Sequence, residues 1–128
     1  MADDTTPLAI LKETLRRFAD ERDWGQFHTP KNLSMGMAVE AAELMEHFLW
    51  IDGPASREIK HDPDKLEEVA DEMADVACYL LTMSYTLDID LSDAIVRKIA
   101  KNARKYPAEK VRGHYEVRPE KRGNKKGK

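Results

Sequence analysis

The chain has 128 residues, with 21 Lys or Arg against 24 Asp or Glu. Apolar residues make up 41% of it and charged residues 35%, a composition that is typical of one globular domain with a highly charged surface rather than of a disordered chain. The single cysteine, Cys78, excludes an internal disulfide framework and favours a reducing compartment. No apolar run approaches the length of a membrane span and the acidic start MADDTTP is unlike a signal peptide, so we expect a soluble, cytoplasmic protein without membrane contact.

The first predicted element is a helix that opens at Thr6-Pro7, because proline loses nothing at a position where its missing N–H has no partner. The segment Asp23–Gly25 ends it. Its apolar residues recur at helical spacing: Leu8, Leu11, Leu15 and Phe18.

The second predicted helix runs from about Leu33 to Ile51 and stops at Asp52-Gly53-Pro54. A loop over residues 26–32 precedes it, in which Pro30 biases Thr29 away from helical geometry. Its apolar residues include Met35, Val39, Ala42, Met45 and Leu49.

The third helix is the longest and is predicted over residues 64–87, after the cap-and-proline pair Asp62-Pro63. A short turn over 88–91 leads to a fourth helix, capped by Asp90 or Ser92 and reaching about Arg104. Since no β alternation of useful length appears, the predicted fold is all-α, a four-helix bundle with short connections. The segment VACYLLTM of the third helix is apolar nearly all round, which favours subunit association.

The last segment of the chain differs from the rest in charge. Residues 108–128 carry eight basic and three acidic residues and end in RPEKRGNKKGK, without apolar periodicity. We therefore predict a folded domain over 1–107 and a basic, disordered tail over 108–128. A solvated solubility tail is favoured over weak attachment to nucleic acid, because no aromatic residue interleaves the terminal basic run.

Two acidic motifs on neighbouring predicted helices carry the candidate chemistry. Glu40 and Glu43 stand three residues apart on the second helix, and Glu72 and Asp75 do the same on the third. Each pair presents one helical face beside apolar residues, and residues 40–75 together hold twelve carboxylates against three basic residues. Such a cluster is repulsive without a cation, and oxygen-only ligands favour a hard one, Mg²⁺ or Mn²⁺.

Two other interpretations compete for these carboxylates. A solvent-facing acidic stripe explains any single pair of carboxylates. This interpretation becomes less favoured relative to a metal site only because two pairs lie on adjacent long helices. A di-iron site of the ferritin type requires Glu-x-x-His on two helices. Residue Leu44 stands three positions before His47, and the third helix contains no histidine, so di-iron is disfavoured.

Four stretches of the chain resemble the all-α nucleoside triphosphate pyrophosphatases of the MazG-like superfamily, and among them the dCTP pyrophosphatase branch. They are ERDWGQFHTPKNL (Glu21–Leu33), EAAELMEHFLW (Glu40–Trp50), EVADEMADVACYLL (Glu68–Leu81) and DIDLSDAIVRKIAKNARKYP (Asp88–Pro107). The resemblance implies hydrolysis of a nucleoside triphosphate to the monophosphate and pyrophosphate. It also implies magnesium held by Glu40, Glu43, Glu72 and Asp75, with Glu43 our choice of general base.

The resemblance also implies substrate contacts. Trp24 and Trp50 match aromatic residues of the base pocket, and His28 and Tyr79 lie beside that pocket or the metal face. Phosphate or sugar contacts are implied for Lys31, Lys98, Asn102 and Tyr106. Each of these residues has an ordinary alternative: the tryptophans, His28 and Tyr79 as packing or loop residues, and the lysines as part of a solvated basic face.

The expected substrate is dCTP or a 5-modified dCTP, and the expected role is sanitation of the nucleotide pool. Leu15 stands where the dCTP branch can carry a histidine, so dUTP or a modified nucleotide remains an alternative substrate. A non-catalytic helical interaction module is the alternative from another class. The resemblance implies dimers or dimers of dimers, and we expect a homotetramer.

Overall fold

The protein is described by a computed structural model that covers residues 1–114. Within this part of the chain the secondary structure is six α-helices and two 3₁₀-helices, without a strand. Their order is α1 (Leu8–Asp20), η1 (Trp24–Phe27), α2 (Pro30–Glu46), α3 (Gly53–Glu58), η2 (Ile59–His61), α4 (Pro63–Thr86), α5 (Leu91–Lys105) and α6 (Ala108–Val111). The predicted all-α class is therefore confirmed. Among the described residues no helix combines the length and the apolarity that crossing a membrane requires.

Helices α2, α3 and α4 begin in the same way, with a capping side chain followed by a proline in the first turn. The Thr29 hydroxyl accepts a hydrogen bond from Asn32 N at 3.2 Å, and the carboxylates of Asp52 and Asp62 cap α3 and α4 in the same manner. These caps satisfy backbone N–H groups that have no partner inside the helix. The predicted start of α4 is confirmed, whereas α2 begins at Pro30, three residues before the predicted Leu33, because Thr29 is its cap.

The second predicted helix is also wrong at its far end, since α2 stops at Glu46 and not at Ile51. Beyond Glu46 the backbone tightens: Phe48 N donates to Met45 O, three residues back instead of four. The segment 53–61, for which no element was predicted, forms α3 and η2. The loop predicted over 26–32 is likewise replaced by η1 and the first turn of α2.

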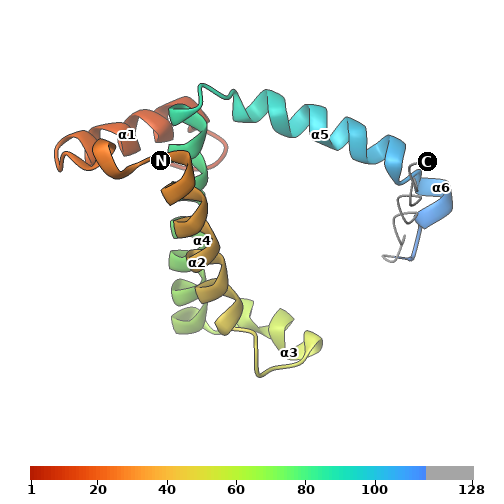
Figure 1. The fold of residues 1–128 in the computed structure, drawn as a ribbon. Helices are drawn as coiled ribbons and strands as arrows, with labels where there is room; N and C mark the ends of the chain where they lie inside the picture. The colour runs from red at the N-terminus through yellow and green to blue at the C-terminus, as the bar shows by residue number, and fades with distance from the viewer. Residues whose placement is uncertain (115–128) are drawn as a thin grey trace, which may run out of the picture. The chain divides into compact units, whose positions relative to one another are not determined.

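The described chain divides into two compact units, residues 1–91 and a second unit that begins at Ser92. In the first unit α2 and α4 run side by side, and α1 packs against α4 (Figure 1). The two long helices are antiparallel in a constant register: Gly36 lies against Tyr79, and His47, eleven residues further along α2, lies against Glu68, eleven residues back along α4. This register decides which side chains of the two acidic motifs meet.

The core of the first unit lies where α1, the start of α2 and the last turns of α4 meet. Ala19, Leu33 and Leu81 are buried there, and the hydroxyls of Thr82 and Ser84 are buried but satisfied by carbonyl oxygens of their own helix. Many large apolar side chains of the described chain are exposed instead, including Met35, Val39, Met73 and Leu80 on the long helices. One chain alone therefore buries little of its apolar surface.

In the second unit, α5 confirms the fourth predicted helix. Helix α6 (Ala108–Val111) lies within the stretch that the charge pattern assigns to the tail, and Pro107 at its N-cap explains the restart of the helix there. The predicted disorder is wrong for these residues. Residues 115–128 of the predicted tail lie outside the described part of the chain.

Candidate active site

The two acidic motifs meet at the contact between α2 and α4. Glu40, Glu43 and Glu72 each offer one carboxylate oxygen such that the three oxygens lie within 4.8 Å of one another. The antiparallel register brings them together, because a step of three residues along α2 is matched by a step of three residues back along α4. Three of the four predicted metal ligands therefore share one site.

In the described part of the chain, the cluster contains buried carboxylate oxygens without hydrogen-bond partners, as a cation site does. Glu40 Oε2 and Glu72 Oε2 are buried and lack a hydrogen-bond partner within the described chain. Burial, followed by the hydrogen bond and charge of Glu43, raises the pKa of Glu40, and the charges of Asp75 and Glu72 raise this pKa further. Oxygens around one octahedral Mg²⁺ lie about 3–4 Å apart, so three carboxylate oxygens within 4.8 Å of one another need only a small side-chain movement to bind one hard divalent cation.

Asp75, the fourth predicted ligand, lies near the cluster but outside the group of three. Its charge acts on Glu40 and also on Cys78, which is close to it on α4. The side chain of Asp75 is exposed. It is therefore placed at the open edge of the cluster rather than at its buried centre.

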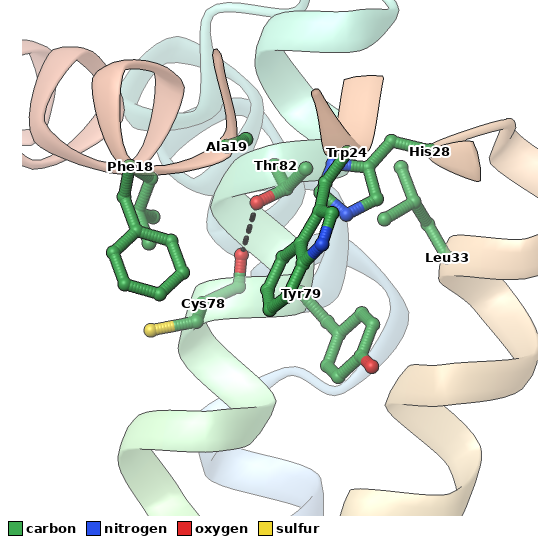
Figure 2. A pocket seen from close by; sticks show the side chains of 9 residues that line it. Phe18, Ala19, Trp24, His28, Leu33, Cys78, Tyr79 and Thr82 are labelled. Carbon is green, nitrogen blue, oxygen red and sulfur yellow. Dashed lines mark hydrogen bonds between the residues drawn. The ribbon is translucent and has the colours of Figure 1, made fainter. Parts of the chain in front are cut away.

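A cavity of about 210 Å³ lies among α1, η1, the start of α2 and the last turns of α4. Figure 2 shows its lining side chains, with Trp24 between Phe18 on one side and His28 and Leu33 on the other, and with Cys78, Tyr79 and Thr82 contributed by α4. The full lining is Leu15, Phe18, Ala19, Trp24, His28, Leu33, Cys78, Tyr79 and Thr82. Three of the predicted substrate residues, Trp24, His28 and Tyr79, thus line one cavity.

The walls of this cavity are mainly apolar and uncharged. Burial, followed by the charge of Asp75, raises the pKa of the Cys78 thiol, which therefore stays protonated at neutral pH. His28 Nδ1 is buried and has no hydrogen-bond partner among the described residues. The cavity is therefore a mainly apolar pocket whose wall contains a buried polar atom, His28 Nδ1, that has no hydrogen-bond partner within residues 1–114.

Trp24 is held in place by its neighbours. Its ring meets Phe18 edge to face, with centroids 5.7 Å apart, and the Arg22 guanidinium lies 3.6 Å from the centroid of the Phe18 ring. Arg22 is fixed in turn by a hydrogen bond from Nη1 to Phe18 O. Asp23 supplies the left-handed backbone that turns the chain from α1 into η1. This stack builds the outer wall of the cavity.

Tyr79 borders the cavity because α2 carries a glycine opposite it. A Cβ atom at Gly36 would lie 2.5 Å from Tyr79 Cε1 and 2.7 Å from Tyr79 Cζ. Only a residue without a side chain allows the ring to lie against the α2 backbone. Since Glu40 follows Gly36 by one helical turn, the ring also places the cavity next to the carboxylate cluster.

Two predicted substrate residues of the first unit do not line the cavity. Lys31 is exposed in the first turn of α2, and Trp50 is 90% exposed in the turns that follow α2. Trp50 thus does not pack against the end of the bundle in this chain. Lys98, Asn102 and Tyr106 belong to the second unit, where Lys98 is exposed on α5 and the other two are half-buried.

Sequence reasoning missed several residues that the structure places at the site, among them His47, Phe18 and Arg22. His47 lies beside Glu72, and Phe18 and Arg22 support Trp24. The signal for His47 was its position one helical turn after Glu43, which places both on one face of α2. Nothing in the spacing around Phe18 distinguishes it from an ordinary core residue.

The chain is similar to several known proteins. A model of the MazG-like family matches residues 36–116. Proteins named dCTP pyrophosphatase 1 from Mus musculus and Homo sapiens are 34% and 37% identical over 105 residues, which is 79% and 78% of this chain but 62% and 61% of those proteins. A solved pyrophosphatase structure from Archaeoglobus fulgidus has a TM-score of 0.72 and 37% identity, covering 84% of this chain and 98% of that one.

The family match contains all four predicted metal ligands, from Glu40 to Asp75, whereas Trp24 and His28 precede it. The carboxylates gathered by α2 and α4 therefore fall in the part of the chain that the family shares. On the length of this match, and on the identity to the two named relatives, the chain belongs to the MazG-like family.

Proposed function

We propose that the chain is a divalent-metal-dependent nucleoside triphosphate pyrophosphohydrolase that converts dCTP or a 5-modified dCTP to the monophosphate and pyrophosphate. The observation that carries this proposal is the meeting of three carboxylates at the contact of α2 and α4, beginning one helical turn along α2 from Gly36, against which the cavity residue Tyr79 lies. The names of the mammalian relatives and of the archaeal structure support the same reaction class.

The metal ligands in this proposal are Glu40, Glu43, Glu72 and Asp75, and the cation is Mg²⁺, with Mn²⁺ as a substitute. When bound, the cation would neutralise phosphate charge and increase the acidity of a coordinated water. Two buried oxygens without a partner, on Glu40 and Glu72, support this assignment. The raised pKa of Glu40 supports it as well, because a nearby cation would offset both the burial and the carboxylate repulsion that raise this pKa.

Glu43 is the proposed general base. It is the exposed member of the three clustered carboxylates, so a solvent water can reach it without opening the helix contact. Glu43 would accept a proton from the attacking water as that water's oxygen bonds to phosphorus and the bond between the α- and β-phosphates breaks. The pyrophosphate leaves with the electron pair of the broken bond.

The cavity is the proposed base pocket. Its volume of about 210 Å³ is below the roughly 300–1,000 Å³ of sites that enclose whole drug-sized ligands. It therefore suits a single-ring base better than a complete nucleotide. In this assignment the base stacks on Trp24 and Tyr79, and Leu15 replaces a polar contact with an apolar one. Lys31, Lys98, Asn102, Tyr106 and Trp50 are proposed contacts to phosphate, sugar or base on the resemblance alone.

We also propose a homotetramer, built as a dimer of dimers. Within the first unit, Val39 on α2 and Met73 on α4 are each 57% exposed. An amphipathic helix in this state leaves its apolar stripe in water. Association with further copies of the chain is the simplest way to cover this apolar surface.

We also propose a cytoplasmic location, which fits the single free cysteine.

The test is pyrophosphate release from the four common dNTPs, dUTP and 5-methyl-dCTP, each with Mg²⁺ and with EDTA. We expect Mg²⁺-dependent release that is greatest for the cytosine nucleotides. If pyrophosphate release were greatest for a nucleotide with another base, the proposed reaction would stand, but the proposed preference of the pocket for cytosine would be wrong. Absence of release together with absence of Mg²⁺-dependent nucleotide binding would favour a non-catalytic helical module.

A matched pair of variants tests the proposed base. Glu43→Gln should abolish turnover and keep the helical circular dichroism spectrum, because it removes one charge from a repulsive cluster without changing side-chain shape. Glu67→Gln makes the same chemical change at an exposed position of α4 outside the cluster and should retain turnover. Normal turnover by Glu43→Gln would contradict the assignment.

A further inference from the structure

The strongest unexplained group in the described chain is His47, which caps the C-terminus of α2. Its side chain is only 16% exposed, unlike that of His61, which is 67% exposed. A histidine at the end of a surface helix ordinarily keeps its ring in water, so this one is held by neighbours on α4. Two of those neighbours are carboxylates, Glu68 and Glu72.

The imidazole lies between two carboxylates of α4. His47 Nδ1 is 3.8 Å from Glu68 Oε2, and His47 Nε2 is 3.7 Å from Glu72 Oε1. Glu68 Oε2 also accepts a hydrogen bond from Lys65 Nζ at 3.1 Å. A row of side chains therefore runs from Lys65 through Glu68 and His47 to Glu72.

The two oxygens of Glu72 have different surroundings as a result. Oε1 lies against His47, whereas Oε2 is buried without a hydrogen-bond partner in the described structure. Glu72 is also the one member of the three-carboxylate cluster that comes from α4. Its side chain has several rotatable bonds, so a contact on one oxygen restricts the direction of the other.

We propose that His47 is a positioning residue for Glu72: it holds one oxygen of this carboxylate so that the other faces the cation shared with Glu40 and Glu43. This inference rests on the proposed metal centre. The imidazole does not ligate the cation, since its ligand atoms fall outside the group of three. It acts as the neighbours of metal-binding carboxylates do in other sites, where their loss typically weakens metal binding about 10–100-fold.

The experiment measures Mn²⁺ binding to the full chain, without nucleotide, from the electron paramagnetic resonance signal of free Mn²⁺. His47→Leu keeps a side chain of similar bulk and removes both ring nitrogens, and we expect it to raise the Kd for Mn²⁺ about tenfold or more. His47→Gln, which retains an N–H donor, should recover most of the affinity. His61→Leu removes an exposed histidine whose ion-pair partner is Glu58 and should bind as the wild type does.

Several outcomes would overturn the inference. An unchanged Kd in His47→Leu would do so while leaving the metal centre intact, and so would a His47→Gln variant as weak as His47→Leu. Absence of Mn²⁺ binding by the wild type would instead overturn the metal centre itself. Should His47→Leu not fold, nitrogen hyperfine spectroscopy of Mn²⁺ in the wild type, labelled with ¹⁵N-histidine, decides between positioning and ligation. A directly bonded histidine nitrogen would make His47 a ligand and refute the proposal.

Discussion

At the scale of the residue, Glu40 links the ionisation of the acidic cluster to the stability of the fold. Burial and the neighbouring carboxylates raise its pKa, so the folded, metal-free protein holds this proton at a pH where the unfolded chain has released it. Between the ordinary and the raised pKa the folded state therefore binds more protons. By linkage, the contribution of Glu40 to the free energy of unfolding decreases as pH rises through this window.

This linkage gives a prediction for the melting temperature. A divalent cation favours the ionised carboxylate, so Mg²⁺ should stabilise the protein more at about pH 8 than at about pH 5. Thermal unfolding in EDTA and in Mg²⁺ at the two pH values measures the difference. Glu40→Gln cannot ionise and should show a much smaller stabilisation by Mg²⁺ at the higher pH. An equal effect of Mg²⁺ at both pH values in the wild type would contradict the role of Glu40.

At the scale of the element, the contact between α2 and α4 depends on the glycine that faces Tyr79. Gly36→Ala places a methyl group against the far end of a side chain that borders the cavity. Alanine in place of glycine favours a helix by about 1 kcal/mol, whereas inserting bulk into a packed contact costs about 1–3 kcal/mol. Since the Tyr79 ring can move into the cavity, the two effects nearly cancel in the free energy of unfolding. The displaced ring instead occupies space in the cavity and weakens nucleotide binding there.

We therefore expect Gly36→Ala to change the free energy of unfolding by no more than about 1–2 kcal/mol and to raise the KM for the preferred nucleotide several-fold. Chemical denaturation and steady-state kinetics measure the two quantities. Gly53→Ala is the matched control, because a Cβ there meets no atom within 4 Å. A KM equal to that of the wild type would show that the ring does not move into the base pocket.

At the scale of the whole molecule, the exposed apolar side chains of α2 and α4 predict self-association, and Ile95, Val96 and Ile99 give α5 an apolar stripe of its own. Ile99→Glu places a charge in this stripe and should reduce the molar mass found by light scattering, because a buried unpaired charge opposes association. Lys101→Glu reverses a charge at an exposed position of the same helix and should leave the mass unchanged. A wild-type chain that is monomeric at micromolar concentration would contradict the proposed tetramer.

The basic tail gives a second prediction at this scale. Removing residues 112–128 should leave turnover and molar mass largely unchanged, because every proposed metal and substrate residue precedes position 112. Pyrophosphate release and light scattering of the shortened chain measure both. Loss of either property would assign the tail to the enzyme and not to solubility.

The sequence alone determined the helical class and the start of α4, because these depend on local signals: periodicity, and a cap followed by proline. From the spacing on one helix face it also proposed four carboxylates as candidate metal ligands. It placed the ends of α2 wrongly, since the cap at Thr29 and the tightened backbone after Glu46 compete with the apolar pattern. Such competition is decided by hydrogen bonds that the pattern does not encode.

Only the tertiary structure decided which of these residues meet. The antiparallel register of α2 and α4 places Glu72 between the carboxylates of α2 and His47, and the fit of Tyr79 against Gly36 sets the cavity beside them. Register follows from the packing of side chains far apart along the chain, so no local spacing predicts it. The same reason separates Trp24, which packs on Phe18 and lines the cavity, from the exposed Trp50, although both tryptophans were predicted for the same pocket.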